Sequence, residues 1–226
     1  MKKDLTELVF ILDRSGSMGG LESDTIGGFN ATLQKHREAE GDAVVSTVLF
    51  DNFTEVLHDR IPISTVENLT SRDYWVRGCT ALLDATGGAI RHISRVHGYL
   101  PDEYRPKKTI FVIITDGYEN ASRTYSYPKV REMIEQKKAE GWEFLFLGAN
   151  IDAIGEAAKI GIASDRAATY LADDIGQHIA YEAVADATCA MRSAPCGAQI
   201  DSDWKANVER DTRKRKSSRF GAFSRR

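Results

Sequence analysis

Residues 13–17, with the sequence DRSGS, are the stretch of this chain best suited to chemistry. They directly follow the apolar run at residues 8–12, so they begin where a buried strand is expected to end. Asp13, Ser15 and Ser17 occupy alternate positions, and this spacing can direct three oxygen atoms toward one point. Oxygen ligands suit hard divalent cations such as Mg²⁺, Mn²⁺ and Ca²⁺. The stretch therefore predicts part of a metal site.

Two further oxygen-bearing residues, Thr80 and Asp116, stand where they could complete this site. Thr80 comes at the expected start of a helix, and Asp116 follows the apolar strand expected over residues 109–115. In a doubly wound sheet, the loops at the carboxyl ends of the strands gather in one crevice where the strand order reverses. If the strand ending near Asp13 lies beside the strand ending near Asp116, both acids lie in that crevice.

The elements that must position these residues follow from the apolar patterns. Strands are expected where apolar runs lie between turn residues, at residues 5–12, 42–50, 53–61, 109–115, 143–147 and 167–171. Helices are expected at residues 22–40, 80–97, 127–140, 152–160 and 174–191. Strands that alternate with helices predict an α/β fold with a mostly parallel sheet.

Two details of this arrangement can also be predicted. Only two residues separate the second and third strands, so we expect a hairpin that makes residues 53–61 an antiparallel edge strand. Gly27 and Gly28 fall inside the first helix, where glycine is unfavourable. We expect them to allow close packing of that helix on the sheet.

Three motifs together resemble the metal-ion-dependent adhesion site of the von Willebrand factor type A (VWA) domain, in its bacterial intracellular form. They are Asp13-x-Ser15-x-Ser17, Thr80 and Asp116-Gly117. The resemblance covers roughly residues 5–191 and extends to the apolar residues before the first and last motifs. It implies a Rossmann-like, doubly wound, mostly parallel six-stranded sheet with one antiparallel edge strand and helices on both faces.

The same resemblance implies how the site works. The hydroxyls of Ser15, Ser17 and Thr80 would hold the metal directly, and Asp13 and Asp116 would hold it directly or through water. Mg²⁺ is the expected ion, with Mn²⁺ and Ca²⁺ as alternatives. A Glu or Asp of another protein would supply the last ligand. Relatives of this kind often act beside AAA+ ATPases or in stress-response systems, which makes such proteins candidate partners.

Other interpretations of the motifs stay open. The serines can cap a helix or form turns, Thr80 can be an N-cap, and Asp116 can be a turn acid. Metal-dependent phosphoryl transfer would also use acids around a metal. Against an enzyme, position 15 is Ser where aspartyl phosphatases carry a second Asp, and no Walker-type loop follows a strand. We therefore expect a binding module and no enzymatic activity.

Loop residues on the same face are candidates for contacting the partner, because Trp, Tyr and Arg are favoured at binding hot spots. These candidates are Arg14, Tyr74, Trp75, Arg77, Tyr118 and Glu119. Loop aromatics that fold back onto the core are the alternative interpretation.

The chain divides by charge into an acidic body and a basic end. Residues 205–226 contain nine Lys or Arg and two Asp or Glu, a net charge of +7, which leaves −10 for the rest of a chain whose net charge is −3. We expect a VWA domain over residues 1–194 and a disordered basic tail over residues 195–226. The tail could bind nucleic acid through its basic residues and stack bases on Phe220 and Phe223, or could simply be solvated.

Bulk properties point to a cytoplasmic protein of ordinary globular composition. The apolar run at residues 8–12 is too short for the core of a signal peptide, and no window approaches the ~20 apolar residues that span a bilayer. The three cysteines, Cys79, Cys189 and Cys196, are odd in number and argue against a disulfide framework. We expect buried free thiols, with a bond between Cys189 and Cys196 as the alternative.

Overall fold

A six-stranded sheet runs through the centre of the protein, in a computed structural model that describes residues 5–195 and 201–223. The strand order is β3-β2-β1-β4-β5-β6, and only β3 is antiparallel to its neighbour. The strands are β1 (Thr6–Asp13), β2 (Ala43–Phe50), β3 (Thr54–Pro62), β4 (Lys108–Thr115), β5 (Glu143–Ala149) and β6 (Ala167–Tyr170). This confirms the predicted mostly parallel sheet with one antiparallel edge strand.

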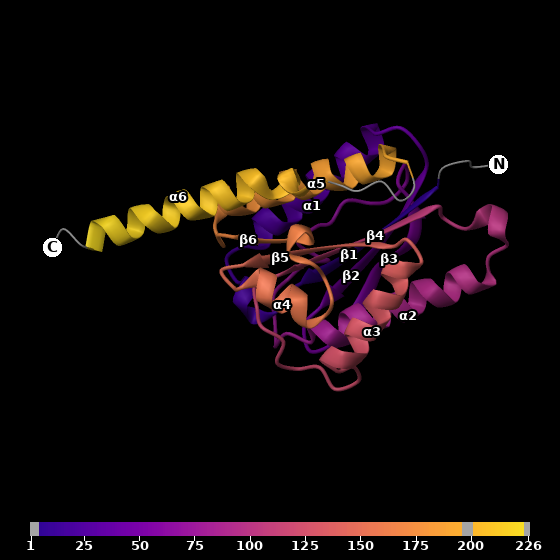
Figure 1. The fold of residues 1–226 in the computed structure, drawn as a ribbon, viewed down its shortest axis with the longest axis horizontal. Coiled ribbons are helices and arrows are strands. Elements are labelled where there is room, and N and C mark those ends of the chain that lie inside the picture. The colour runs from indigo at the N-terminus through magenta and orange to yellow at the C-terminus, as the bar shows by residue number, and fades with distance from the viewer. Residues whose placement is uncertain (1–4, 196–200, 224–226) are drawn as a thin grey trace.

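Helices cover both faces of the sheet, and Figure 1 shows the two layers. The longer helices are α1 (Glu22–Glu38), α2 (Leu82–Tyr99), α3 (Tyr127–Ala139), α4 (Ala153–Lys159), α5 (Asp174–Ser193) and α6 (Ala206–Phe223). Short 3₁₀ helices lie at η1 (Gly16–Met18), η2 (Asp102–Tyr104), η3 (Ser164–Arg166) and η4 (Ser202–Lys205). One core packs α1, α5 and α6 on the sheet, and the other packs α2, α3 and α4 on the opposite face.

The sequence of β1 does not alternate between apolar and polar residues, because both faces of this strand are covered. Leu8 and Phe10 belong to the core under α1 and α5, whereas Val9 and Ile11 belong to the core under α2 and α3. All eight residues of the strand are buried. A strand covered on both faces reads as a continuous apolar run, as parallel strands under two helical layers do.

The C-terminal segment corrects the prediction of a disordered tail. Residues 202–223 form η4 and the 18-residue helix α6, and Val208 is 1% exposed in the core. Polar side chains of this segment bond to carbonyls at the edge of the sheet: Lys205 Nζ donates to Ala167 O at 3.1 Å, and Thr212 Oγ1 donates to Thr169 O at 3.1 Å. The segment thereby covers the edge strand β6, which would otherwise expose unpaired backbone groups. The side chains of Phe220 and Phe223 lie outside the part that the structure describes, so their stacking on bases stays a prediction.

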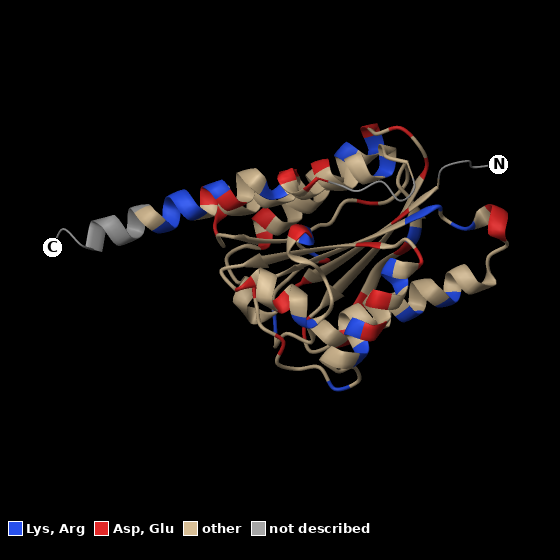
Figure 2. Ribbon diagram, viewed as in Figure 1, with Lys and Arg blue, Asp and Glu red and all other residues tan. Residues whose placement is uncertain are grey.

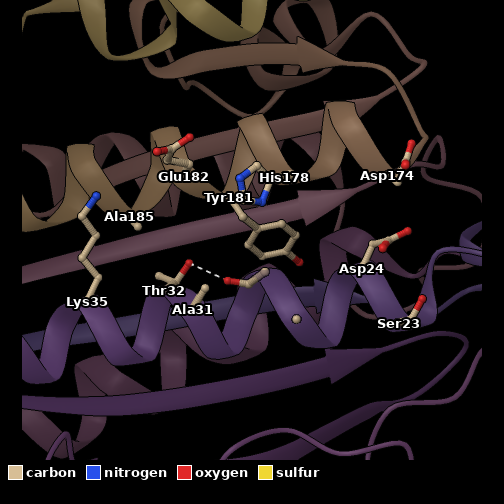
Figure 3. A pocket seen from close by; sticks show the side chains of 12 residues that line it. Ser23, Asp24, Ala31, Thr32, Lys35, Asp174, His178, Tyr181, Glu182 and Ala185 are labelled. Carbon is tan, nitrogen blue, oxygen red and sulfur yellow. Dashed lines mark hydrogen bonds between the residues drawn. The ribbon is translucent and has the colours of Figure 1, made fainter.

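Of the two glycines in α1, only Gly28 serves helix packing, and it does so against α5 and not against the sheet. A groove of about 360 Å³ lies between α1 and α5, and Figure 3 shows the Tyr181 ring between the two helices. A methyl group added to Gly28 would lie 2.5 Å from Cγ and 3.0 Å from Cβ of Tyr181. A methyl group on Gly27 would meet nothing within 4 Å. The groove contains none of the five predicted metal ligands.

Substituting these adjacent glycines should change stability in opposite directions. Gly27→Ala should raise the free energy of unfolding by about 0.5–1 kcal/mol, because alanine loses less backbone entropy in a helix. Gly28→Ala should lower it by about 1–3 kcal/mol, because the methyl group overpacks against Tyr181. Urea unfolding of both variants measures the difference. A Gly28→Ala protein as stable as Gly27→Ala would contradict the packing shown between α1 and α5.

Two remaining predictions concern the cysteines and membranes. Cys79 and Cys189 are free thiols, but Cys79 is exposed and Cys189 is half-buried, which corrects the expectation of burial. Cys196 lies outside the described residues. Within residues 5–195 and 201–223, no helix is long and apolar enough to cross a membrane.

Candidate metal centre

The parallel pairing of β1 with β4 brings the two predicted acids to one edge of the sheet. Leu12 pairs with Ile114, so Asp13 at the end of β1 lies next to the residues that follow β4. Thr115 Oγ1 donates a hydrogen bond of 2.5 Å to Asp13 Oδ2 and ties the two strand ends together. The strand order reverses between β1 and β4, which is where α/β sheets of this type form their crevice.

The three predicted hydroxyls and both acids form one continuous polar network. Thr80 Oγ1 donates to Ser15 Oγ at 3.1 Å, and the Ser15 and Ser17 hydroxyl oxygens are 3.1 Å apart. Ser17 Oγ donates to Asp116 Oδ1 at 2.5 Å, and the backbone N–H of Ser15 donates to Asp13 Oδ1 at 2.7 Å. The structure therefore gathers the five side chains from three separate loops, although the metal itself stays a prediction.

Capping does not account for the hydroxyls of Ser15 and Thr80. Ser15 precedes the 3₁₀ helix η1, but its side chain makes no capping hydrogen bond. Helix α2 begins at Leu82 with Ala81 as its N-cap, so Thr80 lies before the helix and not at its first residue as predicted. Both hydroxyls instead point to each other within the network. The N-cap interpretation of Thr80 is therefore wrong.

Burial shapes the electrostatics of the two acids. Asp13 has no exposed surface, and removal from water raises the pKa of its carboxyl to about 6. Burial also raises the pKa of the Asp116 carboxyl, although this side chain is only half-buried. Among the described residues, no Lys or Arg forms an ion pair with either acid. Two converging acids without a cationic side chain are suited to a bound cation, which favours their charged forms.

The donor set and the available space both fit a hard divalent cation. In the described part of the chain, no group of three or more His, Cys, Asp or Glu side chains could hold a metal. At this crevice the additional oxygen atoms come from the hydroxyls of Ser15, Ser17 and Thr80. A methyl group added to Gly117 would lie 2.6 Å from Thr80 Oγ1 and 3.3 Å from Ser17 Oγ. Glycine therefore keeps open the space between two of the predicted ligands. Hydroxyl and carboxylate oxygens are ligands that Mg²⁺, Mn²⁺ and Ca²⁺ accept.

Arg14 and Tyr74, two predicted partner contacts, are buried and stabilise the loop that carries the site. Arg14 is 1% exposed, and its guanidinium pairs with Asp51 at 3.0 Å and with Glu55 at 2.7 Å. Tyr74 is also 1% exposed, and its hydroxyl donates to the backbone carbonyl of Asp13. Both residues hold the loop after β1 in place. Neither can contact a partner directly, which corrects the prediction.

Glu119 is a structural residue of the loop after β4. Its carboxylate accepts hydrogen bonds from the backbone N–H groups of Leu83, Ala121 and Ser122, at 2.7–2.9 Å. It also accepts from the Ser122 hydroxyl at 2.7 Å. With both oxygens engaged, Glu119 connects this loop to the start of α2. The prediction of Glu119 as a partner contact is therefore also corrected.

Trp75, Arg77 and Tyr118 are the predicted contacts that do reach the surface. Trp75 is 46% exposed and Tyr118 is 52% exposed. The Arg77 guanidinium lies 4.2 Å from the centre of the Trp75 ring, and its Nε donates to Asp51 Oδ2 at 2.7 Å. Stacking of this kind holds the Trp75 ring in place.

Sequence reasoning missed two contributors from the turn after β2. Phe53 is 73% exposed in this turn, at the same edge of the sheet as the site. Asp51 accepts from both Arg14 and Arg77 and so joins the two loops of the site. The available signal was the position of this turn, since it follows a parallel strand adjacent to β1. Because this turn was interpreted only as a hairpin connection, its position beside the site was not considered.

Comparisons with known proteins place the fold. No family model matches the chain, and no curated protein matches it. The matrix protein PTMP1 from the mussel byssus is 15% identical, with a TM-score of 0.58 over 82% of this chain and 46% of its own. A von Willebrand factor type A protein from Catenulispora acidiphila is 13% identical, with a TM-score of 0.54 over 82% of this chain and 43% of its own.

An archaeal structure agrees with these. The ArnB paralog VWA2 from Sulfolobus acidocaldarius is 15% identical, with a TM-score of 0.52 over 81% of this chain and 44% of its own. The chain thus spans less than half the length of these structures. At such identities the likeness concerns the fold, and it confirms the predicted Rossmann-like architecture shared with VWA domains.

Proposed function

We propose that this chain is a divalent-metal-dependent module that binds an acidic side chain of a partner protein. The observation that carries the proposal is the network in which Ser15, Ser17 and Thr80 meet Asp116 across three loops. The VWA fold of the structural neighbours supports a protein-interaction role.

Two kinds of ligand, neutral hydroxyls and charged carboxylates, would hold the cation. The hydroxyls of Ser15, Ser17 and Thr80 would offer neutral oxygens, and Asp13 and Asp116 would offer the negative charge. A bound cation supplies an electrophilic centre that a carboxylate from outside can complete. Three neutral ligands offset little of a double positive charge, so the site would keep its attraction for an acid. Mg²⁺ is the preferred ion in this proposal.

The surface around the site fits a protein ligand. Trp75 and Tyr118 offer exposed aromatic area. The exposed Arg77 guanidinium is paired with Asp51 through Nε, and its other N–H groups can donate to an acidic side chain of a partner. An AAA+ ATPase or a stress-response component in the cytoplasm is the class of partner we propose.

The positions of the described histidines favour binding over catalysis, because none of these side chains lies at the hydroxyl network. His36, His58, His92 and His97 hydrogen-bond to Thr188, Thr47, Asp59 and Glu7, away from the hydroxyl network. The fifth, His178, lines the groove between α1 and α5. The site therefore has no imidazole to move a proton, which general acid–base catalysis most often uses.

Thermal unfolding with and without metal tests the proposal. A ligand at about 100 times its Kd adds roughly 2.7 kcal/mol to the folded state. For a chain of this size, that gain raises Tm by about 5–10 °C. We expect millimolar Mg²⁺ to raise Tm relative to EDTA, with Mn²⁺ and Ca²⁺ compared alongside. Thr80→Val and Asp116→Ala should abolish the shift.

Thr65→Val is the matched control, because Thr65 is an exposed threonine on another loop. This variant should keep the full metal-dependent shift. If wild-type protein shows no shift with any of the three ions, the metal site does not exist. A shift that survives Thr80→Val would place the metal elsewhere.

A further inference from the structure

The distal half of α6 extends past the edge of the sheet into solvent. Figure 1 shows the helix continuing beyond β6, and Figure 2 shows basic residues concentrated on this projecting part. Residues 213–219 contain five Lys or Arg and no Asp or Glu, and no acidic residue follows to residue 226. We call residues 213–219 the basic arm.

Hydrogen bonds and ion pairs connect η4 and the first half of α6 to the rest of the protein. Trp204 Nε1 donates to Asp165 O at 2.9 Å, and Lys205 Nζ donates to Ser164 O at 2.6 Å. Arg215 then pairs with Asp173 at 2.8 Å and with Asp211 at 2.7 Å. Asp173 is also the N-cap of α5, since it accepts from the N–H of Gly176. These contacts fix the direction in which the arm leaves the body.

Three further basic side chains of the arm reach the surface of the protein. Arg213, Lys214 and Lys216 are exposed. Successive residues of an α-helix are about 100° apart around its axis, so these three point in different directions. Residues 213–217 contain no apolar side chain and so cannot form an apolar stripe. A partner must therefore bind the arm by charge and approach it from more than one side.

We propose that the basic arm binds the phosphodiester backbone of nucleic acid. Duplex DNA carries one negative charge per about 1.7 Å of its axis, on both sides of each groove, which matches basic residues placed around a helix. Residues 1–204, which precede η4's last residue and α6, carry a net charge of −10 and repel such a polyanion. Arg213, Lys214 and Lys216 are exposed, so phosphates can approach them from solvent although Arg215 is paired with Asp173.

Fluorescence anisotropy with the full chain tests the proposal. The probes are a labelled 20-base-pair DNA duplex, the matching single strand and an RNA of the same sequence, all in EDTA. EDTA makes the result independent of the proposed metal site. Three phosphate contacts predict roughly 40-fold weaker duplex binding at 200 mM than at 50 mM salt. The double variant Arg213→Gln, Lys216→Gln should reduce this salt effect to about 3- to 4-fold and weaken binding at 50 mM.

The matched control is the double variant Arg91→Gln, Lys129→Gln, which removes the same charge from exposed positions on α2 and α3. It should bind like wild type. The proposal is overturned if wild type binds none of the three probes at 50 mM salt, or if the arm variant and the control lose binding equally. It is also overturned if the arm instead forms a salt-sensitive dimer, detected by sedimentation without nucleic acid. That outcome would make the acidic body of a second copy its partner.

Discussion

Replacing His36 with glutamine should remove a large part of the protein's sensitivity to acid. His36 lies on α1 with no exposed surface, and burial beside Arg192 and Lys35 lowers the pKa of its imidazole to about 3. The folded state therefore requires the neutral ring. The unfolded chain, with a pKa near 6.5, accepts a proton much earlier as the pH falls.

The hydrogen bonds around His36 explain why the ring must stay neutral. Arg192 Nη1 donates to His36 Nδ1 at 3.0 Å, so this nitrogen carries no hydrogen. Thr188 Oγ1 gives its own hydrogen to Val184 O at 2.7 Å, so it accepts from His36 Nε2 at 2.9 Å. A second proton could only enter at Nδ1, where it would face the guanidinium of Arg192. Both burial and this cation oppose it.

The sign and size of the pH effect follow from the two pKa values. Above pH 6.5 both states are neutral at His36, and the full stability is present. Between pH 6.5 and 3 the unfolded state binds more protons, so stability falls by about 1.4 kcal/mol per pH unit. Over this window the loss approaches about 5 kcal/mol as an upper bound. That is a large fraction of the stability of a typical domain.

Urea unfolding from pH 7 to pH 4 in EDTA measures this slope. Asp13 acts in the opposite direction, because its raised pKa lets the folded state bind a proton first as the pH falls from about 6 toward 3.8. The comparison must therefore be between His36→Gln and wild type, in which Asp13 is the same. His178→Gln, an exposed histidine on α5, is the control and should keep the wild-type slope. An unchanged slope in His36→Gln would show that His36 is accessible to protons.

Gly117→Ala should abolish the proposed metal binding while leaving the fold intact. The backbone of Gly117 does not have a positive φ, so alanine can adopt it without strain. The added methyl group would nevertheless lie 2.6 Å from Thr80 Oγ1, which forces this hydroxyl out of the network. Changes to residues that orient metal ligands typically cost about 10–100-fold in affinity. Displacing a ligand should cost at least the upper end of that range.

The measurement is the Mg²⁺-dependent rise in Tm, compared between wild type and Gly117→Ala. Gly88→Ala serves as the control, because a methyl group there meets nothing within 4 Å on α2. Gly88→Ala should keep the metal-dependent shift and gain a little stability from better helix propensity. If Gly117→Ala keeps the shift too, Thr80 is not part of the metal site. Loss of the shift with unchanged stability in EDTA is the expected result.

Most of the sheet could be predicted because its signals are local. The apolar run that forms β4 and the two-residue connection between β2 and β3 define their elements without reference to the rest of the chain. The order of the strands follows from general rules of α/β folds once these elements are known. Asp13, Thr80 and Asp116 lie at or next to the ends of strands and helices. An α/β fold with this strand order therefore brings them together.

The C-terminal segment could not be predicted in the same way. Its composition is typical of disorder, with few apolar residues and many charges. In the structure, it is held by bonds to β6 carbonyls and by the pairing of Arg215 with Asp173, which lies 42 positions away in sequence. Such contacts depend on which edge of the sheet remains uncovered, and composition carries no information about that.

Residue type and order alone thus determined the α/β class, the antiparallel hairpin and the five side chains of the candidate site. Tertiary structure decided the role of each residue around it. Arg14 and Trp75 both looked like surface residues on loops, but Asp51 and Glu55 draw Arg14 into the interior while Trp75 stays exposed. The difference arises because periodicity reports which face of an element is buried, whereas the burial of a loop residue depends on charges and surfaces that only folding brings near.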